Sequence, residues 1–281
     1  MKTIEIRPLS ATVGAEVCGL DAGDLAADAT LSSQLVNALE AHGVLVFRGM
    51  HLRPEEQVAF CGHIGEVDRS NGNHGVEGIY RISLDPAVSG HSASYLRGTF
   101  AWHVDGCTPD GGEWPQMATV LSAKVVAAHG GETEFASSYA AYDELTDDEK
   151  THFQALRVVH SFEASQRRVR PDPSPKQIAA WRTQPPHEHP LVWTHRTGRR
   201  SLLLGASADH IVGMSLDDGR ALLDRLLARA TTGDRVYRHK WLVGDTVIWD
   251  NRGVLHRAAP YDPASGREML RTTILGDEPI R

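Results

Sequence analysis

Apolar residues return at helical spacing in several segments of the chain. Over residues 31–42, Leu31, Leu35 and Leu39 occupy one face, and Gly43 follows where a helix can end. Residues 54–63 carry a proline in the first turn, and residues 146–156 begin with a Thr-x-x-Glu capping pattern. Residues 217–230 have a leucine-rich face that excludes arginine. We predict helices over residues 31–42, 54–63, 146–156 and 217–230.

Shorter apolar runs bounded by turn residues predict strands, and two of these runs flank Thr197 and Gly198 as a hairpin. Many strands with few helices, and no internal repeat or linker, favour a β-barrel or jelly roll with flanking helices. We therefore expect residues 1–281 to form a single, mainly β domain. The predicted strands cover residues 2–7, 12–18, 44–47, 102–105, 117–127, 191–195, 201–204, 236–241, 246–249 and 269–275.

Two stretches show no clear periodicity of apolar residues. Residues 66–98 are rich in Gly, Ser, Asn and His, and we interpret them as loop and short strand that could form a lid. A plain surface connection is the alternative, although a loop this long inside a compact domain is more often functional or mobile. Residues 163–189 are polar and Pro-rich, so we predict an excursion from the core with one helix near residues 176–182.

Composition and charge narrow the class of protein. The net charge is −7 and the basic residues are scattered, which argues against a nucleic-acid-binding surface. No apolar run approaches the roughly 18 residues that span a bilayer. The three cysteines show no metal-binding spacing, and we see no signal peptide. We expect a soluble, cytoplasmic protein that binds neither nucleic acid nor membrane.

His103 and Asp105, in the segment Trp102-His103-Val104-Asp105, are the first candidates for chemistry. On a strand, residues two apart share a face, so these side chains would form two corners of a metal site. His256 is the candidate for the third corner. Two histidines and one carboxylate on one side of a metal is the arrangement of non-haem Fe(II) oxygenases. Since about one such His-x-Asp pair arises by chance, a surface polar pair and a core histidine remain alternatives.

Arg267 and Arg271 are candidates for binding anions. At four residues apart on a strand they share a face about 13 Å apart, so they fit two different anions rather than one. Arg presents a planar fork that can bind a carboxylate with two hydrogen bonds. Thr133 follows the Gly130-Gly131 turn, where its hydroxyl could reach a cavity. Exposed arginines on a strand edge and a structural threonine are the alternatives.

Other arrangements are weaker. His187-Glu188-His189 lies among prolines in an irregular stretch, which makes it a poor metal site. The Gly-rich segment at residues 110–113 lacks the lysine and hydroxyl of a phosphate-binding loop. There is no Gly-x-Ser-x-Gly elbow of a serine hydrolase and no dinucleotide-binding fingerprint after a strand.

Taken together, the motifs resemble those of the Fe(II)/2-oxoglutarate-dependent taurine and 2,4-dichlorophenoxyacetate dioxygenase family. The resemblance runs nearly end to end, and the C-terminal third is closer to the phenoxyacetate branch. It implies a double-stranded β-helix, which is a jelly-roll, cupin-like barrel with helices outside. The segments that carry it are residues 14–17, 43–49, 102–105, 130–135, 189–192, 244–252, 256–257 and 271–277.

The resemblance also implies roles for individual residues. His103, Asp105 and His256 match the iron ligands, and Thr133 and Arg267 match the residues that bind the far carboxylate of 2-oxoglutarate. Arg271 matches the arginine that binds the acidic group of the substrate. Asn251 and Trp102 are candidates for supporting the ligands from behind.

Departures from the family pattern bear on the substrate. Ser70 and Thr99 stand where taurine-specific relatives have histidine and asparagine, which argues against taurine itself. Asp105 is kept as the carboxylate ligand, so we expect hydroxylation and not chlorination.

The expected activity is hydroxylation of a small anionic substrate, aryloxyalkanoate-like or another carboxylate. Molecular oxygen is consumed, and succinate and carbon dioxide are released. A homo-oligomer is expected from the family. The alternatives are a sulfonate or alkyl sulfate dioxygenase of the same family, a non-oxidative metal-dependent lyase or hydrolase on the same barrel, and a non-catalytic binding protein.

Overall fold

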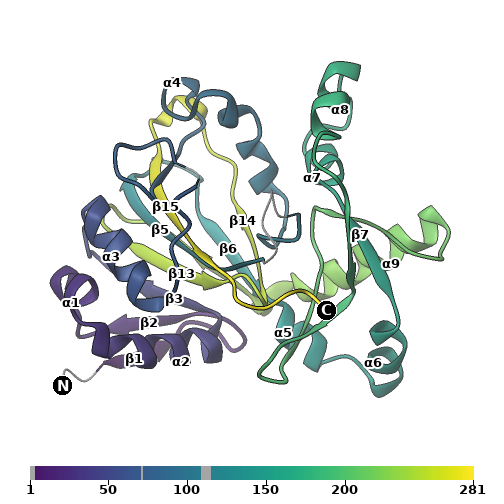
Figure 1. Cartoon of the computed structure of the whole chain (residues 1–281), viewed down its shortest axis with the longest axis horizontal. Helices are drawn as coiled ribbons and strands as arrows, with labels where there is room; N and C mark the ends of the chain where they lie inside the picture. The colour runs from purple at the N-terminus through teal and green to yellow at the C-terminus, as the bar shows by residue number, and fades with distance from the viewer. Residues whose placement is uncertain (1–3, 71, 109–114) are drawn as a thin grey trace.

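A seven-stranded sheet dominates the computed structural model, which describes residues 4–70, 72–108 and 115–281 (Figure 1). Neighbouring strands pair antiparallel, except that β2 and β3 are parallel. The order across the sheet is β1 (Glu5–Pro8), β2 (Ala15–Cys18), β3 (Val44–Phe47), β13 (Thr246–Asp250), β5 (Gln116–Val125), β15 (Glu268–Leu275) and β4 (Tyr80–Ile82).

A three-stranded sheet faces the large one across a shared core. Its order is β12 (Val236–His239), β6 (Thr133–Ser137) and β14 (Val254–Ala258), all antiparallel. Alternation along each strand decides which side chains enter the space between the sheets. On the large sheet these include Val247 and Trp249, and on the small one Phe135 and Val254. The candidate site lies in this space.

The outer face of the large sheet is covered by helices. Ile248, one residue from Val247, points to this second core. It packs there with leucines such as Leu35 and Leu39, which follow the predicted helical spacing. The covering helices are α1 (Ala22–Ala27), α2 (Ser32–His42) and α3 (Pro54–Ile64).

A third layer packs on the outer face of the small sheet, where Ala136 and Leu255 enter a separate core. Figure 1 shows α7 and α8 standing away from the two sheets, above β7. The elements are α5 (Ser138–Asp143), α6 (Asp147–Gln154), α7 (Phe162–Arg167), α8 (Pro175–Trp181), α9 (Leu216–Ala230), the β11–β7–β8 sheet (Ala208–Ile211, Arg157–His160, His187–Pro190) and the β9–β10 hairpin (Val192–Thr194, Arg200–Leu202).

The structure confirms the four predicted helices and most predicted strands, including the hairpin around Thr197 and Gly198. Residues 66–98 contain β4, helix α4 (Pro86–Ser89), one 3₁₀ turn (Gly90–Ser94) and the start of another (Leu96–Phe100). Whether they act as a lid stays a prediction. Among the described residues, no helix is long and apolar enough to cross a membrane.

Three predictions of local structure were wrong. Residues 102–105 are not a strand, because only His103 pairs, in an isolated bridge with His256, before the chain turns at Gly106 with φ +91°. We predicted no strand over residues 254–258, which follow a polar turn, but these residues form β14 and contain His256. Residues 163–189 contain helix α8 as predicted, but also most of α7 and part of β8, which pairs with β7.

Candidate active site

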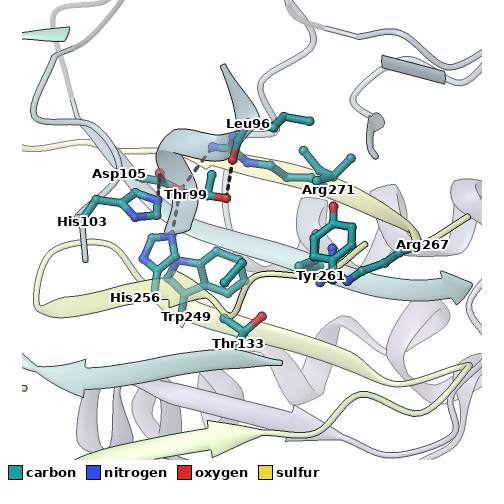
Figure 2. Close-up of a pocket in the computed structure, with 13 residues that line it drawn as sticks. Leu96, Thr99, His103, Asp105, Thr133, Trp249, His256, Tyr261, Arg267 and Arg271 are labelled. Atoms are coloured by element: carbon teal, nitrogen blue, oxygen red, sulfur yellow. Dashed lines mark hydrogen bonds and ion pairs between the residues drawn. The ribbon is translucent and has the colours of Figure 1, made fainter. Parts of the chain in front are cut away.

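His103, Asp105 and His256 converge although 150 residues of chain separate them. Their ligand atoms all lie within 4.8 Å of one another, and no other such cluster of His, Cys, Asp or Glu occurs in the described residues. Two backbone hydrogen bonds hold the bridge, from His103 N to His256 O (3.0 Å) and back (2.9 Å). Figure 2 shows the three side chains pointing toward one another beneath the turn that carries Leu96 and Thr99.

The orientation of the two imidazoles fits a metal ion. His103 Nδ1 is hydrogen-bonded to the Ala101 carbonyl (2.9 Å), which leaves Nε2 toward Asp105 at 3.7 Å. His256 Nε2 lies 3.8 Å from the same carboxylate. These separations exceed a direct hydrogen bond, and a metal-binding histidine characteristically donates its other nitrogen to a carbonyl, as His103 does here. The donor set of two imidazoles and one carboxylate suits Fe(II).

Charge and burial prepare these groups for a cation. Burial raises the pKa of the Asp105 carboxyl, but the charge of Arg271, the two histidines when protonated, and the hydrogen bond from Thr119 lower it by more, so the pKa lies below its usual range. Burial, with the neighbouring His103, lowers the pKa of His256 to about 3. The site therefore offers a carboxylate and a neutral imidazole with a free lone pair near neutral pH.

Thr119 and Asn251 orient the Asp105 carboxylate. Thr119 Oγ1 donates to Asp105 Oδ2 (3.1 Å) and accepts a hydrogen bond from Asn251 Nδ2 (2.9 Å). Because the amide nitrogen can only donate, the threonine proton is directed to the aspartate. Asn251 was expected behind the ligands, whereas nothing local in the sequence marks Thr119 on β5. Trp102 instead packs in the core with its ring 4.8 Å from the Arg257 guanidinium.

A cavity of about 640 Å³ extends from the triad between the two sheets, with Thr133 and Arg267 in its lining. Arg267 is only 4% exposed, and its guanidinium donates to the Gly131 carbonyl (3.1 Å) and lies over the Tyr261 ring. Burial lowers its pKa from the ordinary value. No acidic side chain pairs with it among the described residues. A buried guanidinium without a counter-ion is costly, so this one is suited to a bound anion.

Thr133 is prepared to donate a hydrogen bond into the same cavity. Its Oγ1 accepts from Trp241 Nε1 (2.9 Å), and because the indole can only donate, the hydroxyl proton stays available. Thr133 and Phe135 share the face of β6 that points toward the large sheet, which explains how a strand-end threonine reaches the cavity. Trp241 and Tyr261 were not identified from the sequence.

Arg271 lies on β15, whose pleat places it in the same cavity. Its Nη2 donates to Gln116 Oε1 (2.8 Å) and to Asp105 Oδ2 (3.3 Å). Its Nε is buried and has no hydrogen-bond partner in the described part of the chain. Arg267 precedes β15, and the pairing of β15 with β5 shifts register between Glu268 and Met269. The two arginines therefore occupy separate places in one cavity.

The competing candidates do not assemble into a site. His187 and His189 stack, but His189 Nε2 is hydrogen-bonded to the Cys107 carbonyl, and the pair is not part of the one metal-type cluster in the described residues. The Gly-rich segment at residues 110–113 lies outside the described residues.

Two facing sheets with a His-Asp-His cluster and a buried arginine between them define a metal-dependent enzyme of the oxygenase type. The comparisons with known proteins agree. A profile described as "Taurine catabolism dioxygenase TauD, TfdA family" matches residues 5–273. The chain therefore belongs to this family, and it is an Fe(II)- and 2-oxoglutarate-dependent dioxygenase.

Relatives cover nearly the whole chain. The alpha-ketoglutarate-dependent 2,4-dichlorophenoxyacetate dioxygenase of Cupriavidus pinatubonensis is 37% identical over 87% of this chain and 88% of its own length. The (S)-phenoxypropionate/alpha-ketoglutarate-dioxygenase of Sphingobium herbicidovorans is 34% identical over 97% and 95%. The alpha-ketoglutarate-dependent sulfate ester dioxygenase of Pseudomonas putida is 32% identical over 99% and 91%. The crystal structure of AAD-2 in complex with Mn(II) and N-oxalylglycine superposes with a TM-score of 0.83 at 32% identity, covering 99% and 100%.

Proposed function

We propose that the protein hydroxylates a small organic anion, with an aryloxyalkanoate or a similar carboxylate as the preferred class. Substrate, 2-oxoglutarate and O₂ become hydroxylated product, succinate and CO₂. One oxygen atom enters the substrate and the other enters succinate. If the new hydroxyl is on a carbon that bears an ether oxygen, the hemiacetal-type product breaks into a carbonyl compound and an alcohol or phenol.

In this proposal His103, Asp105 and His256 hold Fe(II), because they form the cluster with free ligand atoms described above. Iron and 2-oxoglutarate, when bound, supply the oxidative decarboxylation that provides the oxidising power for C–H hydroxylation. The protein supplies placement, exclusion of water and charge. Thr119, itself held by Asn251, donates to one oxygen of the Asp105 carboxylate, so the other oxygen would be available to the metal.

The observation that carries the proposal is the buried guanidinium of Arg267, which has no acidic partner in the described chain and shares a cavity with the triad. It would bind the carboxylate of 2-oxoglutarate remote from the metal, with the Thr133 hydroxyl as a second donor. Tyr261 supports the guanidinium plane from one side. A bidentate arginine with a hydroxyl donor fixes both the position and the orientation of a carboxylate.

Arg271 would bind the acidic group of the substrate. Its unpartnered Nε is available to an anion that enters the cavity, while Gln116 holds Nη2 in place. The position of this anion relative to the triad then decides which carbon faces the metal.

Several further features form part of the proposal. The two facing sheets would be the two halves of a double-stranded β-helix in a single domain, with residues 66–98 as a lid. The cytoplasm is the expected location, in keeping with three free cysteines. A homo-oligomer would cover exposed apolar side chains such as Leu242, which is 63% exposed. Light scattering of the purified protein tests the oligomeric state.

A sulfate ester or sulfonate is the second candidate substrate, since one arginine can bind any of these anions. The similarity to the sulfate ester dioxygenase of Pseudomonas putida supports keeping it. A panel of aryloxyacetates, alkyl sulfates and sulfonates, assayed for substrate-dependent succinate release and oxygen uptake, separates the two classes. Consumption of an acid without oxygen uptake would instead indicate a non-oxidative lyase.

The roles of the two arginines can be tested separately. Arg267→Ala should raise the KM for 2-oxoglutarate roughly tenfold to a hundredfold, because charge-assisted hydrogen bonds are lost. Arg271→Ala should raise the KM of the anionic substrate by a similar factor and leave that of 2-oxoglutarate unchanged. Arg196→Ala removes an exposed arginine and is the control. If both active-site variants keep wild-type KM values, the anions bind elsewhere.

His103→Ala should abolish succinate release altogether. Substrate-dependent release at the wild-type rate from this variant would refute the assignment of the ligands.

A further inference from the structure

A second cavity reaches the triad from another direction. It has a volume of about 670 Å³, is open to solvent, and lies between the 3₁₀ turn at Leu96–Phe100 and helix α7. It shares only Thr99, His103 and Asp105 with the cavity that contains the arginines. A molecule anchored on Arg271 could therefore pass the triad and place its remaining atoms in this second space.

Apart from Thr99, His103 and Asp105, which it shares with the first cavity, the second cavity is lined by apolar and small residues, three hydroxyl-bearing residues (Thr108, Ser165 and Ser207), Tyr95 and one amide. Tyr95 and Phe162 meet edge to face, with ring centroids 5.6 Å apart, and form an aromatic wall. The hydroxyl groups of the two serines are already hydrogen-bonded. That of Ser165 donates to the Phe162 carbonyl (2.7 Å), and that of Ser207 is hydrogen-bonded to His160 Nδ1 (3.0 Å). Such a wall accommodates a ring or an alkyl chain.

Gln166 supplies the amide of this lining. The residue is only 5% exposed and lines the cavity, yet its side-chain amide has no hydrogen-bond partner within residues 4–70, 72–108 and 115–281. Its Nε2 packs against Gly98, where an added Cβ would lie 2.8 Å away, so the amide is held in place. A primary amide offers two donors and one acceptor, and this one borders an open cavity with no partner from the protein. The amide is therefore suited to a polar group of a ligand.

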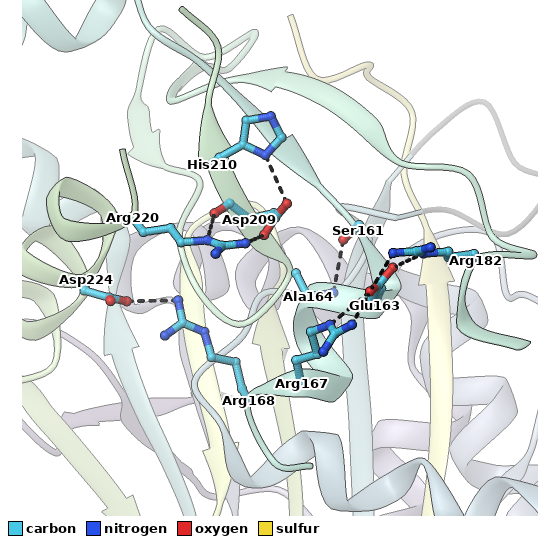
Figure 3. A network of polar contacts seen from close by, with 10 residues as sticks. All are labelled: Ser161, Glu163, Ala164, Arg167, Arg168, Arg182, Asp209, His210, Arg220 and Asp224. Carbon is cyan, nitrogen blue, oxygen red and sulfur yellow. Dashed lines mark hydrogen bonds and ion pairs between the residues drawn. The ribbon is translucent and has the colours of Figure 1, made fainter. Parts of the chain in front are cut away.

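The wall that carries Gln166 is anchored at both ends. Figure 3 shows Ser161 capping α7 at Ala164, and Glu163 between Arg167 and Arg182 at the end of α8. Arg168 pairs with Asp224 on α9. Each pair is exposed and contributes little alone, but together they fix α7 to both neighbouring helices. The amide is thus presented from a fixed support.

We propose that this second cavity holds the body of the substrate and that Gln166 selects bodies that carry a hydrogen-bonding group. This inference rests on the proposed function, since Arg271 is taken as the anchor for the acidic end. The substrate class becomes an acid joined through the reacting carbon to an aromatic or alkyl body with a hydroxyl, carbonyl or similar substituent. Gln166 is then a specificity-determining residue that acts by contact with the substrate.

The experiment compares ortho-, meta- and para-hydroxyphenoxyacetate with the matching methylphenoxyacetates. Their dissociation constants are measured on the full-length protein loaded with Mn(II) and N-oxalylglycine. At least one hydroxy isomer should bind the wild type roughly three- to tenfold more tightly than its methyl counterpart, as expected for one neutral hydrogen bond in a buried site. In Gln166→Leu this preference should vanish or reverse. Ser165 lines the same cavity, but its hydroxyl is already hydrogen-bonded, so Ser165→Ala should keep the wild-type preference.

Two results would overturn the inference. One is that Gln166→Leu weakens hydroxy and methyl compounds equally at every ring position. The other is that none of the six compounds binds the wild type. The proposed function is judged separately, by succinate release with iron and 2-oxoglutarate. A variant-dependent binding preference without any succinate release would support the role of Gln166 and refute the reaction.

Stability gives a second measurement. Because the amide has no partner in the protein, Gln166→Leu should leave Tm unchanged or raise it by about 2–4 °C. A drop of more than about 3 °C would show that the amide is already bonded within the protein, and the inference would fall.

Discussion

Gly131 is the residue whose replacement tests the co-substrate pocket most directly. Its φ is +76°, and an added Cβ would lie 2.9 Å from Arg267 Nε and 3.0 Å from its Cδ. Ordinary contact begins near 3.4 Å, so Gly131→Ala must displace the guanidinium by about 0.5 Å. Arg267 would then lose its fit to a carboxylate, because a bidentate pair depends on planar alignment.

The expected loss can be estimated from this geometry. If the displacement removes one of two charge-assisted hydrogen bonds, the cost is about 1.5–3 kcal/mol, which raises the KM for 2-oxoglutarate roughly tenfold to a hundredfold. The backbone strain of a non-glycine residue at positive φ adds about 1–2 kcal/mol against folding. Steady-state succinate release at varied 2-oxoglutarate measures the first effect, and thermal unfolding measures the second.

Gly198 provides a matched control. Its φ is +84°, and an added Cβ would meet nothing within 4 Å. Gly198→Ala should therefore lower Tm by a similar amount and leave the KM for 2-oxoglutarate unchanged. If the KM values of the two variants agree within about twofold, displacement of Arg267 does not matter and the reasoning about this pocket is wrong.

Three further outcomes are expected. Thr119→Val removes the hydrogen bond to Asp105. It should weaken the binding of Mn(II) to the metal-free protein about tenfold to a hundredfold, as measured by calorimetry. An unchanged Mn(II) affinity would show that Thr119 and Asn251 do not position the Asp105 carboxylate. Mn(II) should raise the Tm of the metal-free wild type but not that of His256→Ala, and equal shifts would place the metal elsewhere. Burial lowers the pKa of His160 to about 3, so the unfolded chain takes up a proton there below pH 6.5 and this residue should contribute a fall in stability of about 2 kcal/mol from pH 7 to 5. In urea unfolding, His160→Gln should make the fall smaller by that amount, and an unchanged fall would assign the dependence to other groups, such as His256.

The helices and most strands could be predicted because each has a local cause. The leucine spacing of α2 and the capping pattern of α6 specify them without reference to the rest of the chain. Residues 102–105 failed because their conformation depends on one bridge to His256, a residue distant in sequence. The convergence of the three candidate metal ligands, His103, Asp105 and His256, was nevertheless expected, because the family resemblance connects the segments that contain them.

The supporting residues could not be predicted in the same way. Gln116 on β5 reaches Arg271 because β5 pairs with β15, and Thr119 on the same strand reaches Asp105 because the segment after the His103 bridge lies against β5. Gln166 looks like any polar residue of a short helix until the fold buries its amide beside a cavity. Register and burial of this kind arise from strand pairing across the whole chain.

By itself the sequence determined the candidate ligands and anion-binding arginines, the helical segments, and the family to which they point, because these follow from residue type and short spacing. Only the tertiary structure decided that the imidazoles and the carboxylate meet, that Arg267 is buried without a counter-ion, and that a second cavity with an unpaired amide adjoins the triad. The physical reason is that distance, burial and hydrogen-bond satisfaction are properties of packed surfaces, which form when distant segments come together.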